Sequence, residues 1–352
     1  MPLPFAAPPE SLCILRLSAV GDVCHTLPVV RTIQYAWPHT RLTWIIGKTE
    51  ASLLSGIPDI EFVVFDKSLG WRAYLKVRQQ LAGQRFDALL HMQMSLRSSL
   101  INRLVNTDIR LGFDRARAKD LQWLVNNHQI PAHSHQHVMD SLFGFTEALG
   151  ITERRLTWNI PVSQQDKDVV DALIPHDKPL LVISPCSSMS YRNWNAEGYA
   201  VIADYAATQY DLNVVVSGGP TPAERDMGEQ IIQLARHKPL SLIGKTNLKQ
   251  LLYLLDRATA LVSPDSGPAH MATAVRTPVI SLYACTNPDR ARPYFSHKTV
   301  VDKYHETVIK KFGKSADELP WGLRVRDPGT MDTISTDDVT KKLDEVMGES
   351  GE

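Results

Sequence analysis

Short apolar runs alternate with longer amphipathic stretches in the first half of the chain. The runs span residues 12–17, 42–46, 62–65 and 88–90, and stretches with helical spacing span residues 27–35 and 71–81. A further stripe at Val138, Leu142, Phe145 and Leu149 predicts a helix that stops at Gly150. None of the apolar runs alternates with period two, which is typical of parallel strands covered on both faces. The first half is therefore predicted to be a doubly wound α/β structure.

The second half repeats this rhythm. Its apolar runs span residues 180–184, 214–217, 240–243, 261–263 and 279–282, and helical patterns span residues 199–207, 223–235 and 248–257. Residues 303–330 show no clear period, whereas Ser335 and Thr336 precede a last amphipathic helix. The pattern predicts a second α/β layer structure of Rossmann type.

Length and composition predict how the chain divides. A chain of 352 residues is longer than one core usually grows, and residues 158–179 are proline-rich and charged, as connections between domains often are. We expect a Rossmann-like domain at residues 1–165, a second one at residues 166–330, and a C-terminal helix and tail at residues 331–352.

The overall charge and the cysteines narrow the class of protein. Lys and Arg together number 38, as do Asp and Glu, so there is no global electrostatic case for nucleic acid as a partner. The four cysteines are widely spaced without a CxxC pair, which fits a reducing compartment. No apolar stretch approaches the ~20 residues needed to span a bilayer, and the start lacks a signal-peptide pattern. We expect a cytoplasmic protein, at most peripheral on the inner face of the inner membrane.

Two turns that contain both Gly and Asp carry the candidate chemistry. They lie within residues 17–25 and 263–270, and each follows a strand-like run. In open α/β sheets, ligands bind outside the carboxyl ends of the strands, where backbone N–H groups and helix N-termini face them. The two turns predict two half-sites, although Asp22 and Asp265 could each be a helix cap.

Four motifs in order resemble glycosyltransferase family 9, the bacterial lipopolysaccharide heptosyltransferases. They are Arg16 to Val23, Arg110 to Asp114, Gly218 to Pro220 and Asp265 to His270, within about residues 12–295. The resemblance implies a GT-B fold, in which two Rossmann-like domains face a central cleft and bind the acceptor and ADP-heptose, respectively. It also implies inversion at the sugar carbon, with no metal and no cofactor apart from the donor substrate.

Within that family, residues 18–28 look most like the heptosyltransferase I type. The implied function is transfer of heptose from ADP-heptose to a Kdo-containing lipid A acceptor in lipopolysaccharide inner-core biosynthesis. Residues 303–330 are longer than the common family pattern, which is compatible with a different acceptor, such as one with a single phosphorylated Kdo.

The first half-site concerns the acceptor. An inverting transfer needs one general base to take the proton of the acceptor hydroxyl, and the resemblance gives this role to Asp22. The candidate acceptor-binding residues are Gly21, His25 and Arg97. A histidine on a helix face is more often a packing residue, so His25 has both interpretations.

The second half-site concerns the donor. Its candidate residues are Ser187, Ser188, Arg192, Glu224, Thr246, Asp265, Ser266, Gly267 and His270. The resemblance makes Asp265 a ligand of the sugar hydroxyls, Glu224 a ligand of the ribose, and the two serines ligands of the phosphates. Arg192 stands where the family commonly has Lys, and Asn195 stands where it usually has Pro. Arg is not a neutral replacement for Lys, because its fork can bind two oxygens.

The sequence also raises a metal site and two other functions as alternatives to this assignment. His133, His135 and His137 alternate, but no Asp, Glu or Cys nearby completes a ligand set, so a polar loop is expected rather than a metal site. Helix dipoles and basic side chains would then carry the leaving-group charge. The alternatives are another nucleotide-sugar enzyme of the same fold, such as an epimerase, and a non-catalytic nucleotide-binding protein. The last would not need an acid–base residue in the acceptor half.

Overall fold

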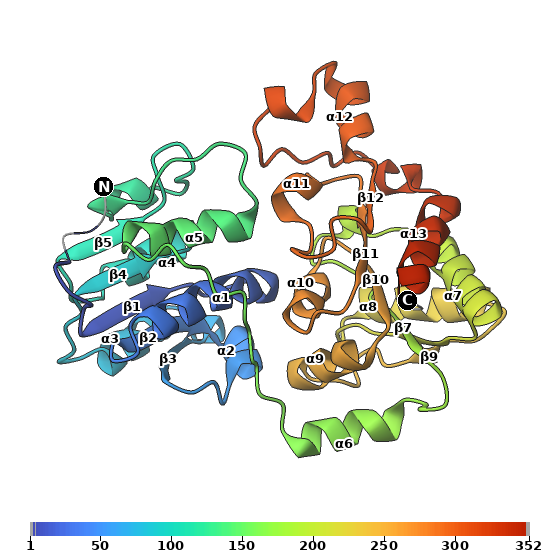
Figure 1. Cartoon of the computed structure of the whole chain (residues 1–352), viewed down its shortest axis with the longest axis horizontal. Coiled ribbons are helices and arrows are strands. Elements are labelled where there is room, and N and C mark those ends of the chain that lie inside the picture. The colour runs from blue at the N-terminus through green and yellow to red at the C-terminus, as the bar shows by residue number, and fades with distance from the viewer. Residues whose placement is uncertain (1–2, 4, 350–352) are drawn as a thin grey trace. The chain divides into compact units, whose positions relative to one another are not determined.

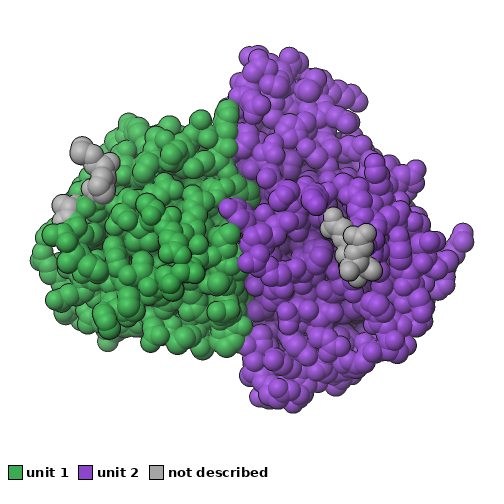
Figure 2. Space-filling view, viewed as in Figure 1, with its two compact units in different colours: residues 1–161 green, residues 162–352 purple. Residues whose placement is uncertain are grey.

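The computed structural model describes residues 3 and 5–349, and the chain divides into two compact units, residues 1–161 and 162–352 (Figure 2). This division lies four residues before the boundary expected at residue 165, inside the proline-rich connecting stretch. Residues 331–349, which we expected as a separate helix and tail, belong to the second unit.

The first unit is built on a parallel sheet with the strand order β3-β2-β1-β4-β5-β6 (Figure 1). Its strands are β1 (Ser11–Leu15), β2 (Arg41–Gly47), β3 (Ile60–Phe65), β4 (Ala88–His91), β5 (Ile109–Gly112) and β6 (His128–Gln129). Its α-helices are α1 (Val20–Ala36), α2 (Lys48–Leu54), α3 (Arg72–Gln80), α4 (Leu96–Asn102) and α5 (Val138–Ala148). This is the Rossmann order, and the winding reverses between β1 and β4, where such sheets bind ligands.

The second unit repeats that plan with the order β12-β11-β10-β7-β8-β9, again parallel throughout. Its strands are β7 (Leu180–Ile183), β8 (Asn213–Val216), β9 (Leu240–Ser241), β10 (Ala260–Pro264), β11 (Val279–Tyr283) and β12 (Val300–Asp302). Its α-helices are α6 (Gln164–Leu173), α7 (Ala196–Tyr210), α8 (Pro222–Leu234), α9 (Leu248–Arg257), α10 (Gly267–Ala274), α11 (Pro288–Ala291), α12 (Tyr304–Phe312) and α13 (Thr336–Glu349). The winding reverses between β7 and β10, so the predicted α/β class is confirmed in both halves.

Helix α1 begins earlier than the periodicity predicts. The pattern placed its start at Leu27, but the helix already begins at Val20 and contains Gly21 and Asp22. The backbone N–H of Ala19 donates to Asp22 Oδ2 at 3.1 Å, which closes the first turn. Asp22 is therefore the third residue of the helix and not its N-cap.

Residues 303–330 are more regular than we expected, because they contain α12 and a short 3-10 helix at Ala316–Glu318. Tyr304 and Val308 of α12 are buried in a small cluster with Ala316 and Val325. Because only a few residues of this segment are buried, its apolar residues are too few to show helical periodicity in the sequence.

The C-terminal helix agrees with its prediction. The Ser335 hydroxyl accepts a hydrogen bond from the Asp338 backbone N–H at 3.2 Å, and Val339, Leu343 and Val346 are buried in the core of the second unit. Over residues 3 and 5–349, none of the helices combines the length and the apolar character that a membrane crossing requires.

Candidate functional site

Asp22 of α1 lies just after β1, beside the point where the first sheet reverses. Its Oδ2 forms an ion pair with Arg16 Nη2 at 2.6 Å, and 38% of the Asp22 side chain is exposed. Because the carboxylate is held by a guanidinium and by the Ala19 N–H on one oxygen, its orientation is fixed while part of it faces solvent. A fixed, accessible carboxylate is the geometry that a general base needs.

Arg16 is the residue of this half-site that sequence reasoning left without a role. Its side chain is largely buried, and Nη1 donates to the backbone carbonyl of Met92 at 2.5 Å, just after β4. The neighbouring Leu17 N–H donates to Gln93 Oε1 at 2.6 Å. Arg16 thus joins the ends of the two strands that flank the switch point and holds Asp22 there. In the sequence, the sign of a role for Arg16 was its position at the start of the first motif.

The predicted acceptor residues lie in different environments. His25 is 2% exposed, and its ring lies 5.6 Å from the ring of His137 in an edge-on contact, which is a packing environment. Gly21 is buried in the first turn of α1. Arg97, the second residue of α4, is exposed and has no ion pair among the residues that the structure describes.

His133 and His137, two of the alternating histidines, have separate contacts in the structure. His137 is the N-cap of α5, and its Nδ1 accepts the Met139 backbone N–H at 3.1 Å. His133 Nε2 lies 3.6 Å from a carboxylate oxygen of Glu147. In the described part of the chain, no three His, Cys, Asp or Glu side chains gather closely enough to hold a metal ion.

In the second unit, Arg192, Asp265 and His270 come together at the ends of β7 and β10. Arg192 Nη1 lies 3.0 Å from Asp265 Oδ2, and His270 Nε2 lies 3.7 Å from Asp265 Oδ1. The Arg192 and Asp265 side chains are only 13% and 11% exposed. The resemblance placed all three at the donor. The fold brings Arg192, from the segment after β7, to Asp265, which follows β10, and to His270 of α10.

Burial and charge pairing shift the pKa values of Asp265 and Arg192 in opposite directions. Burial alone would raise the pKa of Asp265, but a hydrogen bond from His270, the charge of Arg192 and a hydrogen bond with Thr286 hold it below its ordinary value. Burial alone would lower the pKa of Arg192, but the Asp265 carboxylate and the Tyr191 hydroxyl outweigh it and raise this pKa. Asp265 therefore stays ionised in a nearly closed environment.

The loop after β7 is held by its own polar side chains. The Ser187 N–H donates to Asn193 Oδ1 at 2.7 Å, whereas Ser188 is exposed. Asn195, the departure from the family's usual Pro, is the N-cap of α7, where its Oδ1 accepts the Gly198 N–H at 2.8 Å. Asn195 Nδ2 also donates to Asp332 Oδ1 at 2.9 Å, so the substitution leaves a well-defined helix start.

Glu224 lies in the first turn of α8, which follows β8, and Thr246 lies on the loop that follows β9. Glu224 Oε1 accepts the Gly219 N–H at 2.8 Å, and Oε2 accepts the Thr221 hydroxyl at 2.6 Å, so the carboxylate also organises the start of α8. Thr246 is partly buried. The Gly244 N–H donates to the Gly218 carbonyl at 2.9 Å, which joins the two loops.

The start of α10 is arranged differently from a simple helix cap. Ser266 is the N-cap, but its side chain does not cap the helix, because its hydroxyl lies 2.7 Å from that of buried Ser263. Gly267 is the first helical residue and Pro268 follows it. With the Ser266 side chain turned inward, the first N–H groups of α10 are not capped by a side chain.

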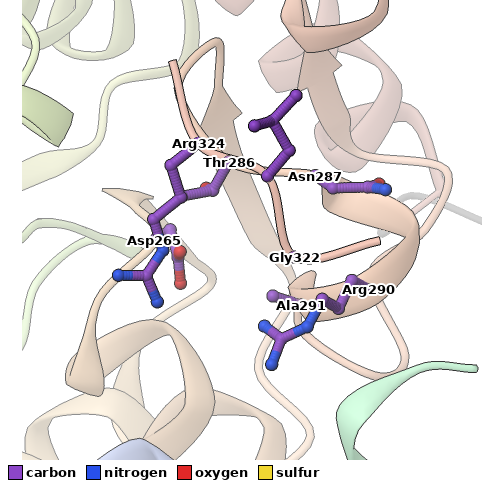
Figure 3. Close-up of a pocket in the computed structure, with 8 residues that line it drawn as sticks. Asp265, Thr286, Asn287, Arg290, Ala291, Gly322 and Arg324 are labelled. Carbon is purple, nitrogen blue, oxygen red and sulfur yellow. The ribbon is translucent and has the colours of Figure 1, made fainter. Parts of the chain in front are cut away.

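A pocket beside Asp265 includes residues that no sequence motif had indicated. It is lined by Asp265, Thr286, Asn287, Arg290, Ala291, Gly322, Leu323 and Arg324 (Figure 3). Thr286 and Arg324 form an antiparallel bridge, although they are far apart in the sequence. Only the folded chain could reveal this neighbourhood.

Two Rossmann-type units, each with an Asp–Arg pair at its switch point, agree with the GT-B class that the motifs implied. The model of glycosyltransferase family 9 (heptosyltransferase) matches residues 74–321. The chain is 42% identical to the lipopolysaccharide core heptosyltransferase OpsX of Haemophilus influenzae, over 97% of this chain and 98% of that protein. The chain therefore belongs to glycosyltransferase family 9, as its motifs predicted.

More distant relatives and solved structures are similar over nearly the whole chain. Lipopolysaccharide heptosyltransferase 3 of Escherichia coli (strain K12) is 24% identical, over 94% of this chain and 96% of its own length. The crystal structure of a family 9 glycosyl transferase from Veillonella parvula matches with a TM-score of 0.78 at 21% identity, covering 97% of both chains. E. coli heptosyltransferase WaaC with ADP matches with a TM-score of 0.69 at 20% identity, over 96% of this chain and 99% of that chain. The GT-B prediction is confirmed, and neither the epimerase nor the non-catalytic alternative is favoured.

Proposed function

We propose that the protein transfers heptose from ADP-heptose to a Kdo-containing lipid A acceptor in lipopolysaccharide inner-core biosynthesis. Its similarity to a lipopolysaccharide core heptosyltransferase over nearly the whole chain supports the reaction class. The observation that carries the mechanism is the fixed, partly exposed Asp22 carboxylate at the switch point of the first sheet. Asp22 gives the first unit a group that a nucleotide-binding module would not need.

In this mechanism Asp22 takes the proton of the acceptor hydroxyl. The hydroxyl oxygen forms a bond to the anomeric carbon of heptose from one face, while the bond from that carbon to the diphosphate oxygen breaks on the other. The products are the inverted glycoside, ADP and a protonated Asp22. Arg16 acts as a positioning residue that holds the carboxylate.

The second unit supplies the donor site in this proposal. Asp265 accepts hydrogen bonds from sugar hydroxyls, and the N–H groups at the start of the eight-residue helix α10 approach the donor at Gly267. Arg192 and the serines after β7 hold the diphosphate, and Glu224 holds the ribose. The buried positions of Arg192 and Asp265 support this role, because their electrostatic interactions with a bound donor are stronger where water is excluded.

Metal-free transfer and the location at a membrane belong to the same proposal. The positive side chains and helix N-termini of the second unit would stabilise the leaving diphosphate, so we expect no metal requirement. The acceptor carries a lipid, so the protein would work in the cytoplasm at the inner face of the inner membrane, with Arg97 among its contacts with the anionic acceptor.

The decisive experiment offers purified protein ADP-heptose and a panel of truncated lipid A cores, with products read by mass spectrometry. The proposal predicts one added heptose on a Kdo-bearing acceptor, in the presence or absence of a chelator. Acceptors with one Kdo, one phosphorylated Kdo or two Kdo residues test the heptosyltransferase I assignment. Absence of transfer to every Kdo-bearing acceptor would reject the proposed function.

A further inference from the structure

The segment before the last helix places a guanidinium beside the donor cluster. The backbone of Arg324 forms an antiparallel β-bridge with that of Thr286. The Val325 N–H donates to the Cys285 carbonyl at 2.9 Å. Val325 is buried against Tyr304, whose hydroxyl donates to the Leu323 carbonyl at 3.0 Å. These contacts fix the backbone on both sides of Arg324. The fold therefore determines where the Arg324 backbone lies.

Sheet order shows on which side of Asp265 this guanidinium lies. Asp265 follows β10, which lies between β7 and β11. Arg192 belongs to the loop after β7, whereas Arg324 bridges the segment directly after β11. Asp265 is thus flanked by an arginine on each side, and the Arg324 side chain points toward it in Figure 3.

The charge of Asp265 is already compensated without Arg324. Arg192 lies 3.0 Å from its carboxylate and His270 lies 3.7 Å from it, whereas Arg324 has no ion pair within the described residues. Arg290 lines the same pocket and adds a second positive charge. Arg324 therefore gives the pocket a positive charge beyond the one that already pairs with Asp265.

Asn287 adds a second, independent indication of a ligand. It lines the pocket and is 3% exposed, and its Oδ1 accepts the Asp289 N–H at 2.9 Å. That hydrogen bond identifies the other amide atom as Nδ2, which is buried and has no acceptor among the residues described. An unpaired buried donor costs free energy, and a ligand oxygen would recover it.

We propose that Arg324 and Asn287 form an anion subsite beside Asp265, which binds the acid group of the acceptor. This inference rests on the proposed function, in which Asp265 holds the donor sugar and Arg192 holds the diphosphate on the β7 side. If Asp265 holds the sugar and Arg192 holds the diphosphate on the β7 side, the β11 side of Asp265 is left for the other substrate. A carboxylate or a phosphate on the acceptor would fit this chemistry.

The test compares Arg324→Gln with Lys314→Gln, which removes an exposed charge of the same segment that lines no pocket described above. Calorimetry with ADP-heptose and with a deacylated Kdo-bearing acceptor measures binding without turnover. For Arg324→Gln we expect acceptor affinity to fall about tenfold, the loss expected for one charge-assisted hydrogen bond. ADP-heptose affinity should stay within twofold, and Arg324→Lys should be intermediate. Melting temperatures establish that each variant is folded.

Two outcomes would overturn the subsite as proposed. Equal acceptor affinity in Arg324→Gln and Lys314→Gln would show that Arg324 binds no anion. A loss confined to ADP-heptose would mean that the anion is the donor diphosphate and would reject the acceptor assignment. If the wild-type protein binds both substrates but transfers no heptose, the proposed function fails while the binding comparison still decides the subsite.

Discussion

The two Asp–Arg pairs of this molecule share a location but differ in environment. Asp22 and Asp265 each follow a strand beside the switch point of a Rossmann-type sheet. The Asp22 side chain is 38% exposed and pairs with Arg16, whereas that of Asp265 is 11% exposed and is held by Arg192 and His270. An accessible carboxylate can exchange a proton with a substrate, while a buried and fully paired one is suited to fixed hydrogen bonding. The same local plan therefore supports two different roles.

The largest effect is expected from removing the exposed carboxylate. Asp22→Asn keeps the shape and can still accept the Ala19 N–H, but it cannot take a proton. We expect turnover to fall by roughly two to four orders of magnitude, with little change in melting temperature. Steady-state kinetics measure this effect, and near-normal turnover would refute the role of general base.

Breaking the buried pair should affect stability as well as binding. Arg192→Ala removes the guanidinium that pairs with the buried Asp265 carboxylate, so we expect a loss of about 3 kcal/mol in the free energy of unfolding. ADP-heptose affinity should fall too, and Arg192→Lys should be better tolerated because it keeps the positive charge. Denaturant unfolding provides the measurement. A stability equal to that of the wild type would mean that the pair does not act as a buried ion pair.

The buried pair should also give stability a characteristic pH dependence. The folded-state pKa of Asp265 lies below its ordinary value of 3.8, so its contribution is complete above that pH and is lost as the pH falls through the folded-state pKa. Wild type should therefore be more stable than Asp265→Asn at pH 7, and the difference should shrink below about pH 3.8. Unfolding measured at both pH values checks this, and a difference that grows on acidification would contradict the sign.

The smallest effect is expected at the exposed cation of the first unit. Arg97→Glu should raise the acceptor Michaelis constant a few-fold and change donor affinity less, because one exposed charge is well solvated. The effect should diminish at high salt as screening increases. Equal losses of donor and acceptor binding would show that Arg97 serves the fold.

Much of the fold could be predicted because long elements carry strong periodicity. Helix α9 matches its prediction at both ends, since Asn247 and Gln250 form a capping box before an amphipathic stripe. Strands β6 and β12 have two and three residues, too few for a pattern to show. The start of α1 was missed because Gly21 and Asp22 were interpreted as a turn.

The candidate site was predictable only where its residues share a motif. Asp22 and Asp265 stand in recognisable Gly-containing motifs, so the sequence pointed to both. Arg324 reaches Asp265 through a bridge to Thr286 between segments that are distant in sequence. The position of Arg324 beside Asp265 depends on contacts between distant segments, and hydrophobic periodicity in the sequence carries no information about such contacts.

The central claim is that the second unit binds the donor and the first supplies the base. The most direct measurement is calorimetric titration of ADP-heptose into wild type, Asp22→Asn and Asp265→Asn. The account predicts that Asp22→Asn binds the donor as wild type does while Asp265→Asn binds it at least tenfold more weakly, the effect of losing a charged hydrogen-bond acceptor. Equal weakening in both variants, or weakening in Asp22→Asn alone, would contradict it.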